Sequence, residues 1–142
     1  MVEIRTVYEG QLRTRAVHGP SGQQVVTDAP VDNRGKGESF SPTDLVATAL
    51  GSCMLTILAI AAEARGLDVR GARVRVVKHM GLEPRRHIAR LSVDLELPDI
   101  EGSERAALEA AAKTCPVAES LGARLEQVVN FHWGAITFRP ES

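Results

Sequence analysis

The stretch Ser41 to Arg65, S-P-T-D-L-V-A-T-A-L-G-S-C-M-L-T-I-L-A-I-A-A-E-A-R, decides the fold. Ser41 suits a helix N-cap, and Asp44 three residues later can complete a capping box. Gly66 follows where the left-handed residue that ends a helix is usual. Leu45 to Ala62 contains no charged side chain, so we predict a long helix that protein surrounds on every face.

Two other interpretations of this helix compete with that of a buried one. The run approaches the length of a membrane span, but polar residues such as Thr48 and Thr56 dilute it, and we predict no membrane association. Small residues four apart, Ala47 with Gly51 and Thr48 with Ser52, let another backbone approach closely. That backbone could belong to a sheet or to a second copy of the helix, and the spacing leaves both open.

The composition is that of a globular protein. The chain has 142 residues, 44% hydrophobic and 25% charged, which predicts one domain over residues 1–142. A formal charge of −1 gives no reason to expect nucleic acid as a partner. The N-terminal sequence lacks the apolar segment of a signal peptide, so we predict a cytoplasmic location. Two distant cysteines in a reducing compartment do not predict a permanent disulfide.

Strands are predicted on both sides of the helix. Period-two alternation predicts strands at Val2–Glu9, Leu12–Ala16 and Gln23–Thr27, and Asp28–Phe40 reads as a loop. Beyond the helix, alternation predicts strands at Val69–His79 and Ile88–Leu97. Helices follow at Ser103–Lys113 and Pro116–Leu121, and a last strand at Leu125–Phe138 has room for a bulge near Gly134. The order βββ-α-ββ-αα-β indicates an α+β fold with antiparallel sheets.

The two cysteines are the candidate chemical groups. The four histidines do not have the spacing of a zinc motif, and no phosphate loop or dinucleotide fingerprint occurs, so no metal or cofactor is expected. Cys53 lies on an apolar helix stripe, which should suppress its thiolate unless an arginine from elsewhere favours it. Cys115 precedes Pro116 as the expected cap of a short helix, which makes it the more acidic thiol by local physics. Two inert, buried cysteines are the competing interpretation.

The whole chain resembles the OsmC/Ohr family of osmotically inducible and organic hydroperoxide resistance proteins. The similarity rests on S-P-T-D-L-V-A-T-A-L-G-S-C-M, on the hairpin that follows this helix, and on the later C-P-V-A-E-S-L, with weaker support from Y-E-G-Q-L-R. It implies an intertwined homodimer with the cysteine helices packed at the centre. It also implies that Cys53 is the peroxidatic cysteine and Cys115 the resolving one, the reverse of the order that the helix cap suggests.

The resemblance implies a peroxidase mechanism that protects against oxidative stress. The Cys53 thiolate would attack an organic hydroperoxide, the sulfenic acid would condense with Cys115, and a dithiol reductant would reopen the disulfide. An arginine beside Cys53 would favour the thiolate and stabilise the departing oxygen. Arg13 and Arg15 are the candidates from the N-terminal strands, and strand periodicity puts both on the same face. Both would equally suit the solvated face of a strand.

One position departs from the pattern of the hydroperoxide-specialised members. The glutamate that holds the arginine in those members lies ten residues before the cysteine, where this chain has Thr43. Asp44 comes one residue later, and an offset of one residue turns a helical side chain by about 100°. Asp44 is therefore a candidate for the missing carboxylate. A role as helix cap explains this residue equally well.

Two rival functions remain open. A stress-related protein of this fold could bind an apolar small molecule without any cycling of its thiols. Alternatively, Cys53 could act in a reductase or hydrolase on another electrophile. Loss of both thiols on exposure to cumene hydroperoxide would exclude the binding protein, and thiol loss with several electrophiles without a preference for peroxide would favour the second rival.

Overall fold

The computed structural model describes residues 1–136. They divide into two compact units, of which the first covers Met1–Val46 and the second begins at Ala47. The order of helices and strands is βββ-α-ββ-αα-β, with a single 3-10 turn added in the loop before the first helix. The α+β class is therefore confirmed. A single domain over residues 1–142 stays a prediction.

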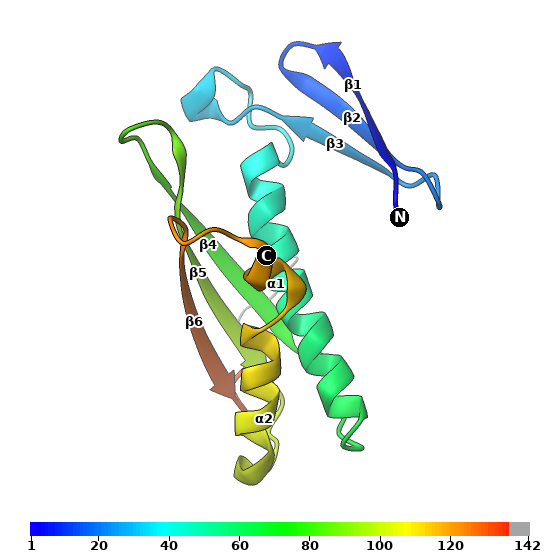
Figure 1. Ribbon diagram of the computed structural model, residues 1–142, viewed down its shortest axis with the longest axis vertical. Coiled ribbons are helices and arrows are strands. Elements are labelled where there is room, and N and C mark those ends of the chain that lie inside the picture. The colour runs from blue at the N-terminus through cyan, green and yellow to red at the C-terminus, as the bar shows by residue number, and fades with distance from the viewer. Residues whose placement is uncertain (137–142) are drawn as a thin grey trace. The chain divides into compact units, whose positions relative to one another are not determined.

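The first unit contains an antiparallel sheet in the order β1-β2-β3, drawn in blue in Figure 1. Its strands are β1 (Ile4–Gly10), β2 (Arg13–His18) and β3 (Gln24–Asp28), and η1 (Val31–Asn33) follows in the loop. Leu12, predicted as the start of β2, instead shares the hairpin turn with Gln11, and both have positive φ. The loop after β3 packs back on itself, since a Cβ at Gly35 would lie 1.7 Å from the carbonyl oxygen of Ala29.

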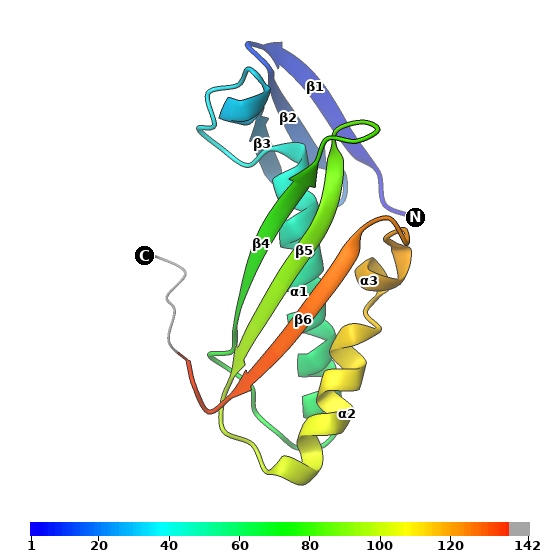
Figure 2. The same ribbon diagram turned by 90° about the vertical axis from the view of Figure 1, so that its left-hand side faces the viewer.

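The second unit holds a three-stranded sheet in the order β4-β5-β6, with helices on one face (Figure 2). Helix α1 (Pro42–Glu63) begins in the first unit and continues into the second. After it come β4 (Arg73–Gly81), β5 (His87–Leu97), α2 (Gly102–Lys113), α3 (Pro116–Ser120) and β6 (Glu126–Trp133). Alternate residues of β5 form the centre of the core and are fully buried: Leu91, Val93, Leu95 and Leu97. The predicted alternation in this strand therefore marks the core face.

The second sheet is mixed, whereas the sequence predicted antiparallel sheets. Strands β4 and β5 form the predicted antiparallel hairpin, but β6 runs parallel to β5. The reason is the connection, because α2 and α3 return the chain to the end of the sheet at which β5 began. Strand β6 ends at Trp133, and Gly134 lies in a turn with φ +77° rather than in a bulge. Residues 137 and 138 of the predicted strand lie outside the described residues.

Strand β4 begins at Arg73, four residues later than predicted. The intervening segment is a turn in which the Asp68 carboxylate accepts hydrogen bonds from the backbone and the guanidinium of Arg70. Gly71 in this turn has φ +89°. An aspartate that bonds the backbone two residues on favours a turn over a strand, and this local chemistry outweighs the alternation of Val69 with Arg70.

Both ends of α1 are those predicted. The Ser41 amide donates to Asp44 Oδ2 at 2.8 Å and the Asp44 amide donates to Ser41 Oγ at 3.1 Å, which is the capping box. At the other end, Gly66 has φ +69° and the Leu67 amide donates to the Ala62 carbonyl oxygen. This pattern is the Schellman motif. Terminal hydrogen-bonding groups therefore fix the length of the helix.

The faces of α1 differ from the prediction. Ala47 and Gly51 are both buried. A Cβ at Gly51 would lie 2.9 Å from Val76 Cγ2, so the backbone that approaches this pair of small residues belongs to the sheet. Ser52, Thr56 and Ile60 are exposed, so protein in the same chain does not surround the helix. By length and composition α1 could cross a membrane, a criterion that the core helix of a soluble protein also meets.

Candidate functional site

Cys53 lies in the middle of α1 and is half-buried. It is two residues from Gly51, whose missing side chain allows the helix to lie directly against Val74 and Val76 of β4. Cys53 is therefore held on a rigid element of the second unit, with its neighbour Ser52 on the exposed face.

Cys115 is the N-cap of α3 and is fully buried. Its Sγ accepts a hydrogen bond from the Ala118 amide at 3.4 Å, and Pro116 occupies the first turn of the helix. The capping role of Cys115 is therefore confirmed. The cap orients the sulfur and fixes its place at the junction of α2 and α3.

The structure brings the two thiols together. Burial raises the pKa of Cys115, and hydrogen bonding with the Cys53 thiol adds to the rise, while the Ala118 amide opposes it. Both cysteines are free thiols. The expectation that the helix cap makes Cys115 an acidic thiol is wrong, because the cost of burying a thiolate exceeds what the backbone amide returns.

The raised pKa of Cys115 predicts a loss of stability in alkali. An unfolded thiol ionises near pH 8.5, whereas the folded Cys115 keeps its proton to higher pH. The unfolded state therefore binds fewer protons, and the free energy of unfolding should fall as pH rises above about 8.5, by up to ~1.4 kcal/mol per pH unit. Urea denaturation between pH 7.5 and 10 measures this slope. Cys115→Ala should flatten it, and identical slopes in the two proteins would contradict the prediction.

The two candidate arginines lie on β2 in the first unit, and they differ in their partners. The guanidinium of Arg15 donates to Glu9 at 3.1 Å and to Gln24 at 2.9 Å, in an exposed arrangement. Arg13 forms ion pairs with the buried Asp28 and with Glu38. Arg13 is therefore the one of the two that lies beside a buried carboxylate.

Asp44 occupies the first turn of α1 and takes part in the capping box with Ser41. Its place in the catalytic machinery stays a prediction. Thr43, at the position of the family's glutamate, lies 3.1 Å from Ser41 through their hydroxyl oxygens.

The histidines form pairs rather than clusters. His79 Nε2 lies 3.3 Å from Ser92 Oγ on the second sheet, and His132 Nε2 lies 3.0 Å from Asp94 Oδ1. Within residues 1–136, no three histidine, cysteine, aspartate or glutamate side chains form a group that could hold a metal ion.

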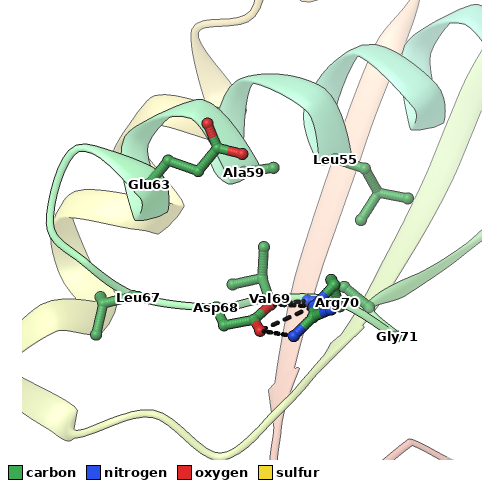
Figure 3. A pocket seen from close by; sticks show the side chains of 9 residues that line it. Leu55, Ala59, Glu63, Leu67, Asp68, Val69, Arg70 and Gly71 are labelled. Carbon is green, nitrogen blue, oxygen red and sulfur yellow. Dashed lines mark hydrogen bonds and ion pairs between the residues drawn. The ribbon is translucent and has the colours of Figure 1, made fainter.

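A cleft of about 470 Å³ lies along the last turns of α1 (Figure 3). Leu55, Ala59 and Glu63 of α1 line one wall, and Leu67–Ala72 line the other. The Asp68 and Arg70 side chains pair with each other at 2.7 Å. Neither cysteine lines this cleft, so it is a separate, largely apolar feature of the second unit.

The family model for OsmC-like protein matches residues 35–128, which include both cysteines. The chain belongs to the OsmC-like family. It is also similar to a candidate osmotic stress induced and detoxification response protein from Psychrobacter arcticus 273-4. The two sequences are 41% identical, the match covers 93% of this chain and 96% of that one, and the TM-score is 0.88.

More distant OsmC-like structures share the fold. An organic hydroperoxide resistance protein OsmC from Legionella pneumophila is 15% identical with a TM-score of 0.72, over 93% of this chain and 96% of that one. The organic hydroperoxide resistance protein OhrB of Bacillus subtilis is 12% identical with a TM-score of 0.67, over 92% and 97%. A search among curated proteins finds no match. The predicted family is therefore confirmed. The two distant similarities show only that these proteins share the fold.

Sequence reasoning missed Asp28 and Glu38. The sequence pattern predicts that Asp28 begins a loop, but it is the last residue of β3 and lies directly opposite Arg13 on β2. The signal that could have found it is the hairpin register, because cross-strand neighbours share a face of the sheet. That register depends on where the turn between β2 and β3 begins, which composition alone did not settle.

Proposed function

We propose that this OsmC-like protein is a thiol peroxidase that reduces organic hydroperoxides. The observation that supports it is that the Cys53 and Cys115 thiols, which come from elements far apart in the sequence, lie close enough to interact. Organic hydroperoxide resistance proteins with this fold supply the substrate class. The less buried thiol, Cys53, is open to a substrate, and the buried Cys115 is suited to act second.

The proposed cycle uses two thiols. The Cys53 thiolate attacks the terminal oxygen of ROOH, the O–O bond breaks, and the alkoxide takes a proton to leave as ROH. The Cys53 sulfenic acid then reacts with the Cys115 thiol, forming the S–S bond and releasing water. A dithiol reductant takes up the oxidising equivalents, reopening the bond by thiol–disulfide exchange. We place the cycle in the cytoplasm, where thiols are kept reduced.

We assign the guanidinium of this mechanism to Arg13 rather than Arg15. A buried carboxylate holds Arg13, whereas the partners of Arg15 are exposed. An arginine keeps its charge when desolvated, so Arg13 can favour the Cys53 thiolate and stabilise charge on the departing oxygen. Asp44 is assigned to capping α1.

Thiol titration tests this function directly. Reduced protein treated with a small excess of cumene hydroperoxide should lose two thiols per chain and gain a Cys53–Cys115 disulfide, both measurable by mass spectrometry after alkylation. Hydrogen peroxide at the same concentration should react more slowly, because an apolar site favours an aryl substrate. A chain that keeps both thiols would point to a binding protein. Equal reaction with unrelated electrophiles would point to another thiol enzyme.

The exposed face of α1 supports the proposed homodimer. Ser52, Thr56 and Ile60 recur every four residues along it, and Ile60 is 57% exposed. Small residues with an apolar one suit close packing of a second helix. Ile60→Glu should therefore convert a dimer to monomers, as measured by sedimentation equilibrium, because a carboxylate in the interface loses its water. Ile60→Val is the matched control and should stay dimeric. A monomeric wild-type protein would overturn this proposal.

A second candidate function is binding of an apolar small molecule. The cleft beside α1 favours it, since Leu55, Ala59 and Val69 give it apolar walls. In that case the thiols would not cycle, and the titration above would show no thiol loss. The same experiment therefore separates the two functions.

A further inference from the structure

A network of three charged side chains lies at the end of the first sheet. Arg13 begins β2 and is paired in register with Asp28, the last residue of β3. Arg13 Nη2 forms an ion pair with Asp28 Oδ2 at 3.6 Å and donates a hydrogen bond to Glu38 Oε2. The Glu38 amide donates to Asp28 Oδ2 at 3.0 Å. The Arg13 guanidinium therefore contacts the carboxylates of both Asp28 and Glu38, and a hydrogen bond from the Glu38 backbone amide joins these two residues.

The two carboxylates differ in burial. The side chain of Asp28 is fully buried, whereas that of Glu38 is 57% exposed. The Asp28 amide donates to the Phe40 carbonyl oxygen at 3.0 Å, which anchors the backbone on both sides of the loop. Asp28 is therefore a fixed negative charge beside Arg13. Glu38 is an exposed one, and water can take its place as a partner of the guanidinium.

Two atoms of this network lack a hydrogen-bond partner among residues 1–136. They are Arg13 Nε and Asp28 Oδ1, and both are buried. A carboxylate buried with a free oxygen is costly unless a nearby cation offsets it. The Glu38 amide offsets part of this cost at Asp28 Oδ2, and the positive charge that offsets the rest comes from the Arg13 guanidinium beside it.

We propose that Asp28 is the positioning residue for Arg13, with Glu38 as an exposed second partner. This inference rests on the proposed function, in which Arg13 serves the Cys53 thiolate. Asp28 then takes the role of the glutamate that the family pattern puts at the position of Thr43, while Asp44 caps its helix. A guanidinium held in one orientation presents its donors to the departing oxygen without first having to be ordered.

The first test compares two carboxylates that each hold one arginine. Asp28→Asn should slow the single-turnover oxidation of Cys53 by cumene hydroperoxide about tenfold or more, since ordering of a catalytic group is worth at least that factor. Glu9→Gln, which removes the partner of Arg15, is the matched control and should change the rate less than about twofold. An unchanged rate in Asp28→Asn would overturn the proposal.

A double variant tests whether Asp28 acts through Arg13. Arg13→Gln with Asp28→Asn should be no slower than Arg13→Gln alone, because residues in one network are not additive. A rate reduced by the product of the two single effects would overturn the proposal. Thermal unfolding of each variant establishes that the compared proteins are folded.

A structural measurement keeps the inference separate from the peroxidase function. Exchange of the Arg13 Nε proton with water, followed by nuclear magnetic resonance, should be slow in the wild type and unchanged in Glu38→Gln, because this atom is buried and Asp28 keeps the side chain in that position. It should accelerate tenfold or more in Asp28→Asn. Fast exchange in the wild type or in Glu38→Gln would overturn the assignment to Asp28. A protein that fails to consume peroxide while showing the expected exchange would overturn only the proposed function.

Discussion

Replacing Cys53 with serine should abolish the reduction of organic hydroperoxides. Serine cannot become a sulfenic acid, and its hydroxyl ionises far less readily than a thiol, so the O–O bond loses its nucleophile. Removal of a nucleophile from a catalytic site commonly costs on the order of 10³-fold or more. Peroxide consumption in the presence of excess dithiothreitol, followed colorimetrically, measures the loss.

Cys115→Ser is the informative control for this prediction. It removes the second thiol but leaves the first step intact, so each chain should still consume one equivalent of peroxide. The Cys53 sulfenic acid should then persist and be trapped by dimedone, giving a mass increase at that residue. Equal loss of the first step in both variants would contradict the assigned order of the cysteines.

Local chemistry explains which parts of the fold the sequence predicted well. The ends of α1 depend on Ser41, Asp44 and Gly66, whose hydrogen bonds and φ angle involve neighbours a few residues away. The β4–β5 hairpin likewise follows from alternation within each strand. These features depend on residues that are close in sequence, so they can be predicted from a short segment.

Features that depend on distant segments were predicted less well. The helix cap at Cys115 was correct, but its effect on acidity was outweighed by burial, which arises from the packing of the whole second unit. The parallel direction of β6 follows from the path of α2 and α3. For the candidate site, both thiols were identified from the sequence, whereas Asp28 was not, because its position opposite Arg13 depends on the register between two strands.

The packing of α1 against β4 gives the largest predicted effect on stability. A Cβ at position 51 would lie 2.9 Å from Val76 Cγ2 and 3.1 Å from Val74 Cγ1. Both valines are β-branched and stiff about χ1, so they cannot easily turn away. Gly51→Leu should therefore lower the free energy of unfolding by about 3 kcal/mol, the upper part of the usual range for overpacking. The gain in helix propensity, about 1 kcal/mol, offsets only part of the underlying clash.

A compensating substitution makes this prediction specific to the contact. Val76→Ala alone should destabilise the protein by leaving a cavity, but combined with Gly51→Leu it provides room for the new side chain. The double variant should therefore be more stable than the sum of the two single effects predicts, by at least ~1 kcal/mol. Urea denaturation followed by the fluorescence of Trp133, the single tryptophan of the chain, gives all four free energies. Strictly additive effects would show that Gly51 matters for a reason other than its contact with β4.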